Sequence, residues 1–225
     1  MIIAIDGPAG SGKSSTAREV ARRLGFVHLD TGAMYRAVTL KALRQGVAVD
    51  DVQGLGALMG STGISFAGAV PDTRILLDGE DVSEAVRGNE VTARVSDYCA
   101  VPLVREELVR LQRATGERSP CVCEGRDIGT VVFPGAALKV YMDATVDERA
   151  RRRQRDFAAA GSTRTLNELV EAIRLRDHKD STRANSPLCR AADAVVVDTT
   201  ALTFEEQVEQ ILSLARARGA GGAAV

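Results

Sequence analysis

Short apolar runs bounded by turn residues recur along the chain and are separated mostly by helix-like segments. The runs are rich in Val and Ile and span residues 2–6, 26–30, 120–124, 138–143 and 194–198. Continuous apolar runs of this length are typical of strands buried on both faces, as in parallel sheets that helices cover on both sides. The pattern therefore predicts an α/β fold, a doubly wound layer around a parallel five-stranded sheet.

Residues 60–96 interrupt this rhythm. In this segment apolar and polar residues alternate, and turns are indicated at Pro71-Asp72 and at Asp78-Gly79. The sequence includes GISFAGAVPDTRILLDGEDVSEAV. Alternation and tight turns of this kind favour short antiparallel strands. We interpret residues 60–96 as a small antiparallel β insert, a subdomain within a single domain that spans residues 1–225.

A strongly basic helix is predicted over residues 144–160. Thr145 is a suitable N-cap, acidic residues follow it in the first turn, and Gly161 ends the segment. On a helix the five arginines of this segment separate into two groups: Arg149, Arg152 and Arg153 share one side, whereas Arg151 and Arg155 lie nearly opposite. We expect the second group to be solvated.

Composition and charge exclude several classes of function. The 225 residues hold 29 basic and 30 acidic side chains, so no whole-protein field favours nucleic acid or an anionic membrane. No window of about 18 apolar residues could span a bilayer, and Met1 leads straight into a strand rather than a signal peptide. We therefore expect a cytoplasmic protein with no nucleic-acid or membrane partner. The four cysteines form no C-x-x-C pair, and we expect buried thiols.

The most specific local motif is a glycine loop near the N-terminus. Residues 7–14, GPAGSGKS, fit G-x-x-x-x-G-K-[ST] in full, between an apolar run and a helix-like run. Glycines let backbone N–H groups surround phosphate oxygens at a helix N-terminus. We expect Lys13 to reach the β- and γ-phosphates of a triphosphate and the Ser14 hydroxyl to bind Mg²⁺. The whole predicted phosphate site comprises Gly7, Pro8, Ala9, Gly10, Ser11, Gly12, Lys13, Ser14 and Ser15.

The glycine loop by itself is compatible with a GTPase, a motor ATPase or a small kinase. A translation-type GTPase needs an N-K-x-D motif, and a motor ATPase normally shows an apolar strand ending in Asp-Glu; we find neither in the sequence. Two further motifs leave predicted strands, HLDTGAMYRAVT at residues 28–39 and CEGRDIGTVVFP at residues 123–134. Ligands bind at the carboxyl edge of such sheets, so both motifs are candidates for an acceptor site.

Taken together, these motifs resemble those of the bacterial cytidylate kinases, a family of P-loop nucleoside monophosphate kinases. The resemblance also includes LLDGEDVSEAVR, VPLVRE, IRLRDHKDSTR and PLCRAADAVVVDTT, in that order, and covers nearly the whole chain. It implies ATP- and Mg²⁺-dependent phosphoryl transfer to CMP or dCMP, giving CDP or dCDP, by a monomer. It also implies that residues 60–96 are a nucleotide-monophosphate-binding subdomain and that residues 145–165 form a helical lid.

The resemblance assigns a role to individual residues. In the acceptor site it places Arg36 and Arg126 on the phosphate, Thr31, Arg105, Asp127 and Arg183 on the pyrimidine ring, and Ser96, Arg176 and Asp180 on the sugar. Lys13, Arg126, Asp127 and Arg153 are the implied catalytic residues. In the lid, Arg153 is the adenine-side residue, and Arg149 and Arg152 are its phosphate-clamping neighbours. If IRLRDHKDSTR is a helix, Arg176, Asp180 and Arg183 share one face.

Several alternatives remain open at this point. Asp127 could accept hydrogens from the amino group of cytosine, which uracil lacks, or it could be a structural or Mg²⁺-shell carboxylate beside Arg126. The enzyme could be a UMP/CMP kinase or another P-loop kinase with a small acceptor. A third hypothesis is a nucleotide-dependent RNA-binding module that uses the arginine run, and the net charge of −1 argues against it.

Overall fold

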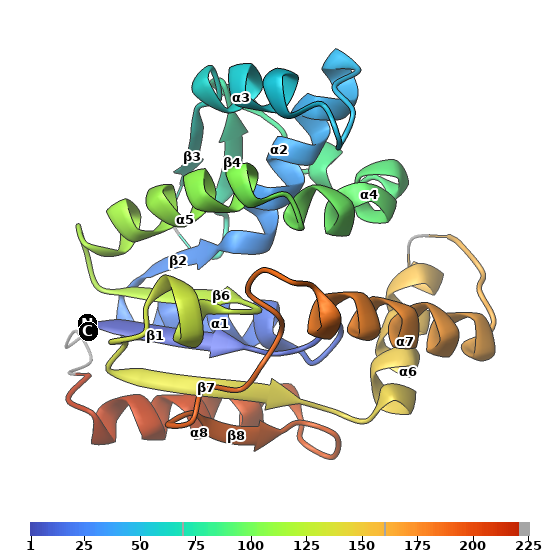
Figure 1. Ribbon diagram of the computed structural model, residues 1–225. Coiled ribbons are helices and arrows are strands. Elements are labelled where there is room, and N and C mark those ends of the chain that lie inside the picture. Colours follow the sequence, from blue (N-terminus) through green and yellow to red (C-terminus); the bar gives the residue numbers. More distant parts are fainter. Residues whose placement is uncertain (69, 160, 221–225) are drawn as a thin grey trace.

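The computed structural model describes residues 1–68, 70–159 and 161–220, and its centre is a parallel sheet. The strands are β1 (Ile2–Asp6), β2 (Val27–Asp30), β6 (Cys121–Gly125), β7 (Leu138–Asp143) and β8 (Val195–Asp198). They lie in the order β2-β6-β1-β7-β8, and every neighbouring pair is parallel (Figure 1). The five apolar runs are thus confirmed as strands, with ends that differ by at most one residue from the prediction.

Strand alternation divides the apolar side chains between two cores. Ile3 and Ile5 of β1 join a core with α1 (Lys13–Leu24) and α8 (Phe204–Ala217). Ala4 and the neighbouring strand residues Cys121 and Cys123 join a second core with α2 (Thr31–Gln45), α3 (Val52–Gly60) and α5 (Pro102–Gly116). Because helices cover both faces of the sheet, β1 is apolar without a break from Ile2 to Ile5, and the doubly wound fold is confirmed.

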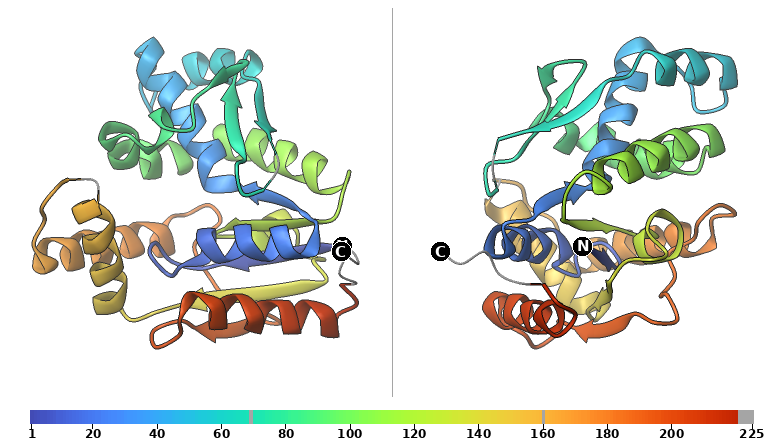
Figure 2. Two further views of the ribbon diagram at one scale, coloured as in Figure 1. Left: turned by 180° about the vertical axis from the view of Figure 1, so that it is seen from behind. Right: turned by 90° about the vertical axis from the view of Figure 1, so that its left-hand side faces the viewer.

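The predicted insert contains a second, antiparallel sheet. Its strands are β3 (Ile64–Ala67), β4 (Arg74–Leu77) and β5 (Glu80–Asp81), joined at β4–β5 by a turn in which Asp78 and Gly79 have φ of 51° and 88°. Positive φ at both turn residues is the geometry that Asp-Gly sequences favour in hairpins. The sheet packs on α2, and both views of Figure 2 show it above the central sheet, on the side of β2.

The rest of the insert is helical. A short turn, η1 (Ala85–Arg87), leads into α4 (Asn89–Cys99). The boundary that we placed at residue 96 therefore falls inside α4, because the side chains of this helix continue to pack against α2 beyond it. Residue 69, within the insert, lies outside the described residues.

Of the predicted lid, residues 145–165, one part is helical, α6 (Val146–Ala159), and a second helix, α7 (Leu166–Thr182), begins directly after it. Thr145 Oγ1 accepts the backbone N–H of Glu148 at 3.3 Å, which confirms the predicted cap. The helices pack together through apolar residues and lie beyond the carboxyl ends of β1 and β7 (Figure 1). Helix α7 ends at Thr182, and Arg183 is extended, with φ −63° and ψ 140°. The expectation that Arg183 continues the helical face of Arg176 and Asp180 is therefore wrong.

The fold also tests the predictions on the cysteines and on membrane-spanning segments. Cys121 and Cys123 are buried, Cys99 is partly buried and Cys189 is exposed, so the prediction of four buried thiols is wrong for Cys189. Within the described ranges, no helix combines the length and the apolar character that crossing a membrane requires.

Candidate active site

The glycine loop connects β1 to α1 at the carboxyl edge of the sheet. A Cβ atom at Gly7 would lie 2.1 Å from the carbonyl oxygen of Met142, so only glycine fits beside β7 at this point. Gly12 is the N-cap of α1 with φ 89°, in the left-handed region that glycine tolerates best. Lys13 is 8% exposed, and its Nζ donates to the carbonyl of Pro8 at 3.3 Å. The loop thus joins the strand to the helix as the motif predicts, with glycine at a close backbone approach and at a left-handed φ.

Most of the predicted phosphate-binding residues line one pocket with several arginines. The loop and the start of α1 contribute Ala9, Gly10, Gly12, Lys13, Ser14 and Ser15; other elements contribute Arg36, Arg126, Arg153, Asp156 and Arg176. We call this the donor pocket. Gly7, Pro8 and Ser11 do not line it. The backbones of Pro8 and Ser11 support the loop instead: the Pro8 carbonyl accepts from Lys13, and the Ser11 carbonyl accepts from Thr199 Oγ1 at 2.9 Å.

The electrostatics of the donor pocket suit an anion. Burial, followed by the charge of Arg126, lowers the pKa of Lys13 to about 7. The charged form of Lys13 is therefore destabilised by its burial, and a phosphate group beside it would stabilise that form. Burial also lowers the pKa of Arg153, which lies in this pocket near Asp156.

Ser14 contacts a buried carboxylate that the sequence prediction did not include. Its Oγ donates to Glu124 Oε2 at 2.5 Å, and the other oxygen, Oε1, lies 3.1 Å from His28 Nε2. Burial alone would raise the pKa of Glu124, but hydrogen bonds from His28 and Ser14 and the charges of His28 and Lys13 lower it overall. A hydroxyl and an ionised carboxylate beside a phosphate cradle are oxygen ligands of the kind that Mg²⁺ takes together with phosphates and waters.

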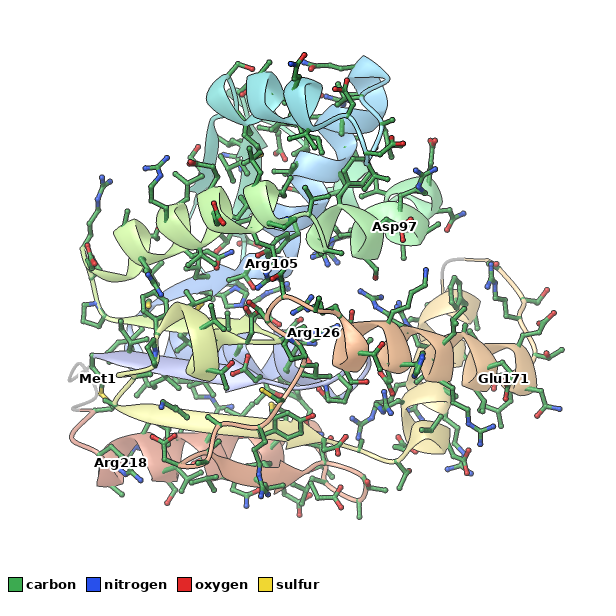
Figure 3. The ribbon with its side chains drawn as sticks, viewed as in Figure 1. Met1, Asp97, Arg105, Arg126, Glu171 and Arg218 are labelled. Atoms are coloured by element: carbon green, nitrogen blue, oxygen red, sulfur yellow. The ribbon has the colours of Figure 1, made fainter. Side chains whose placement is uncertain are left out.

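A second pocket brings together all nine residues that the resemblance assigned to the acceptor. Its lining includes Thr31, Arg36, Ser96, Arg105, Arg126, Asp127, Arg176, Asp180 and Arg183. We call it the acceptor pocket. The residues come from α2, α4, α5, the end of β6, α7 and the segment after α7, and Figure 3 shows Arg105 and Arg126 near the centre of the molecule, where these elements converge.

Two arginines of the acceptor pocket are oriented by carboxylates. Arg126 Nε donates to Asp180 Oδ2 at 2.9 Å, and Arg36 Nη2 donates to Asp30 Oδ2 at 3.3 Å. Both guanidinium groups also line the donor pocket. Their remaining N–H groups can therefore serve phosphates on either side, with the fork geometry that matches a phosphate.

The contacts of Asp127 differ from those of Ser14 and Glu124, which line the same pocket. Its carboxylate accepts a hydrogen bond from Arg105 Nη2, and Arg183 Nη2 is 3.7 Å from its other oxygen. Burial raises the pKa of Asp127, although the charges of Arg105, Arg183 and Arg126 oppose the rise. Its ion-pair partners are thus acceptor-pocket arginines rather than groups of the P-loop.

The arginines of α6 divide as expected, but two of them contact the loop itself. Arg149 donates to the carbonyls of Ala9 and Ala144 and to the carboxylate of Asp177. Arg152 donates to the carbonyl of Gly10 at 3.5 Å and to that of Thr199 at 2.5 Å. These two side chains, which the resemblance assigned to ATP phosphates, hold the glycine loop against α6. Arg151 and Arg155 are exposed, at 56% and 69%.

Asp6 is another residue of the site that sequence reasoning missed. It is 4% exposed, and its two carboxylate oxygens accept the backbone N–H groups of Ile128 at 2.7 Å and Gly129 at 2.8 Å. It thereby ties the strand before the glycine loop to the segment after Arg126 and Asp127. The available signal was its position: Asp6, like Glu124, is a carboxylate at the carboxyl end of a predicted strand, next to a glycine.

The fold and these two adjoining pockets define a P-loop phosphotransferase with separate donor and acceptor sites. Residues 3–217 match the family model of cytidylate kinase. Cytidylate kinases from Geobacillus thermodenitrificans and Pelotomaculum thermopropionicum are 47% and 48% identical to this chain, over 96% and 94% of both partners. The chain belongs to the cytidylate kinase family: it is a nucleoside monophosphate kinase, and the activity of the family is phosphoryl transfer to CMP.

Three further proteins extend these comparisons. The bifunctional pantoate ligase/cytidylate kinase of Synechococcus sp. (strain JA-3-3Ab) is 50% identical over 96% of this chain, which spans 40% of that relative's length. Among solved structures, TT1252 from Thermus thermophilus has a TM-score of 0.51 at 20% identity, with 98% of each chain covered. An uncharacterized protein from Eubacterium ventriosum has a TM-score of 0.53 at 11% identity, covering 96% of this chain and 98% of that one. At such identities the structures support the fold alone.

Proposed function

We propose that the γ-phosphoryl group of ATP, bound with Mg²⁺ at the glycine loop, passes to CMP or dCMP in the acceptor pocket and gives CDP or dCDP. The observation that carries this proposal is that the two pockets adjoin. Five residues line both of them: Lys13, Ser14, Arg36, Arg126 and Arg176. A phosphoryl group at this junction is surrounded by one lysine and three arginines. Catalysis of phosphoryl transfer depends mainly on such positioning and charge neutralisation.

The residues of the acceptor pocket divide the recognition of CMP among them. Arg36 and Arg126, oriented by Asp30 and Asp180, would hold the acceptor phosphate. Arg176 and Asp180, with Ser96, would bind the sugar. Asp127, with Arg105, Arg183 and Thr31, would bind the base. The pairing of Asp127 with Arg105, and of Ser14 with Glu124, favours a base-reading role for Asp127 over a Mg²⁺-shell role.

The donor pocket fits a Mg²⁺-triphosphate. Gly7 and Gly12 let the loop pack closely against Met142 and Gln207, and Ser14 and the adjacent Glu124 would supply oxygen atoms for the ion. The bound ion would neutralise charge on the β- and γ-phosphates. Within the part of the chain that the structure describes, no group of three or more His, Cys, Asp and Glu residues could hold a metal by itself, so the phosphates would complete its coordination.

Replacing Glu124 by glutamine tests the Mg²⁺ assignment. We expect the Mg²⁺ concentration that half-saturates binding of a non-hydrolysable ATP analogue to rise by about tenfold, because an amide is a poorer partner for the ion and for Ser14. The measurement is a Mg²⁺ titration of analogue binding. Glu205→Gln, on the exposed side of α8, is the matched control and should leave the titration unchanged. An unchanged titration in Glu124→Gln would show that Glu124 plays no part in binding the ion.

A panel of acceptors tests the proposed substrate. We expect CMP and dCMP to be phosphorylated with a kcat/KM at least about a hundredfold above that for UMP, AMP or shikimate, because a buried site built for one hydrogen-bond pattern leaves polar groups unpaired with another. The assay is release of ADP at equal acceptor concentrations. Comparable rates with CMP and UMP would contradict strict cytidine specificity and favour a UMP/CMP kinase.

The proposal extends to the organisation of the chain. Residues 60–96, with α2 and α4, would act as the nucleotide-monophosphate-binding subdomain, and residues 145–165 as a lid that excludes water during transfer. The small residues AAAGST at positions 158–163 would suit the hinge of such a lid, and residue 160 among them lies outside the described residues. We propose a monomer, since the large exposed apolar side chains of the described residues come from five different elements.

A further inference from the structure

Tyr35 occupies the acceptor pocket but has no role in the site described so far. It lies on α2, one turn after Thr31, and its side chain lines the pocket. The residue is 8% exposed, so its hydroxyl is removed from bulk water. Within the described part of the chain, the hydroxyl oxygen has no hydrogen-bond partner. A buried polar group without a partner is costly, and such groups in native proteins call for an explanation.

The surroundings of this hydroxyl are those of the predicted base subsite. The guanidinium carbon of Arg105 lies 5.5 Å from the centroid of the Tyr35 ring. The charged and titratable groups that face the tyrosine are Arg105, Asp127, Cys99 and Arg183, and all four line the acceptor pocket. Nη2 of Arg183 is also buried without a hydrogen-bond partner. Two buried polar groups that lack a hydrogen-bond partner, the Tyr35 hydroxyl and Nη2 of Arg183, therefore lie at the end of the pocket that holds the carboxylate of Asp127.

We propose that the Tyr35 hydroxyl is a base-recognition group that donates a hydrogen bond to an acceptor atom of the pyrimidine ring, N3 or O2 of cytosine. The inference rests on the proposed function, since it assumes that the acceptor is a cytidine nucleotide. Burial raises the pKa of Tyr35, so the phenol keeps its proton at neutral pH and can donate. Asp127 would accept a hydrogen bond from the exocyclic amino group of cytosine. The Tyr35 hydroxyl would donate one to N3 or O2 of the same ring.

The test is Tyr35→Phe, which removes the hydroxyl and keeps the ring that contacts Arg105. We expect the KM for CMP and for dCMP to rise by about tenfold, the effect of one buried hydrogen bond, with the KM for ATP unchanged. Inhibition by ribose 5-phosphate, which has no base, should also be unchanged. The melting temperature should stay the same or rise, because no hydrogen bond within the protein is lost.

Tyr98→Phe is the matched control. Tyr98 is 2% exposed, and its hydroxyl donates to the Val47 carbonyl at 2.7 Å, outside the acceptor pocket. This variant should lose stability and keep its KM for CMP, the opposite of Tyr35→Phe. An unchanged KM for CMP in Tyr35→Phe, or an equal loss of ribose 5-phosphate inhibition, would overturn the inference. Failure of the unmodified enzyme to phosphorylate CMP would instead reject the proposed function.

Discussion

Replacing Asp127 by alanine is expected to lower kcat/KM for CMP by about a thousandfold while the affinity for ATP changes by less than about threefold. Truncating one partner of a buried, hydrogen-bonded charge pair costs about 2–5 kcal/mol, and about 4 kcal/mol corresponds to the thousandfold loss. The loss falls on the acceptor side because the partners of Asp127 are Arg105 and Arg183. The glycine loop and the Ser14–Glu124 pair remain intact.

Two measurements separate base recognition from other effects of this substitution. Alanine leaves two buried arginines without their carboxylate, so Asp127→Ala is also expected to unfold more readily. Asp127→Asn keeps the size of the side chain and one acceptor oxygen; it should fold normally and still lose most of the activity with CMP. Binding of ATP, measured without acceptor, should be near normal in both variants. If ATP binding collapsed instead, Asp127 would belong to the metal shell and the base-reading assignment would be wrong.

The second large effect is expected from Lys13→Met, which should lower kcat by about a thousandfold at saturating ATP and CMP. Methionine matches the length of the lysine side chain but supplies neither a charge nor a donor at the junction of the two pockets. Removing one preorganised donor to the charge of a transition state typically costs this much. Single-turnover measurement of phosphoryl transfer would show that the chemical step is affected rather than product release.

Stability gives an independent readout for the same variant. The folded pKa of Lys13 is about 7 and that of the free side chain is 10.5, so between these pH values the unfolded chain binds more protons than the folded one. The free energy of unfolding due to this group therefore falls as the pH drops from 10.5 to 7. Lys13→Met should remove that pH dependence and be at least as stable as the original chain at pH 7, as thermal unfolding at several pH values would show.

Lys41→Met is the control for Lys13→Met. Lys41 is also buried, but it lies in the last turns of α2, and its Nζ contacts Ser61 and Asp78 of the insert rather than the glycine loop. Its replacement should lower stability, because it breaks a paired charge, and leave kcat unchanged. A fall in kcat of less than about tenfold in Lys13→Met would contradict the catalytic role of Lys13.

The sequence by itself determined the sheet, the glycine loop and the residue types of the site. Strands covered on both faces need apolar residues on both sides, so β1 and β6 begin as continuous apolar runs, whereas buried and partly buried residues alternate along β7. The glycine loop is contiguous, and its geometry depends on local φ values and a close backbone approach, which the glycine spacing records. The acceptor residues were named from motif resemblance, which is possible because each motif is short and local.

Only the tertiary structure decided which side chains face one another. Ser14 and Glu124 are 110 residues apart and meet because β1 and β6 are neighbouring parallel strands. Asp6 reaches Ile128 and Gly129 for the same reason, and Arg149 reaches Ala9 because α6 packs on the glycine loop. An unpaired hydroxyl such as that of Tyr35 cannot be recognised in a sequence, because having no partner is a property of the whole packed surroundings.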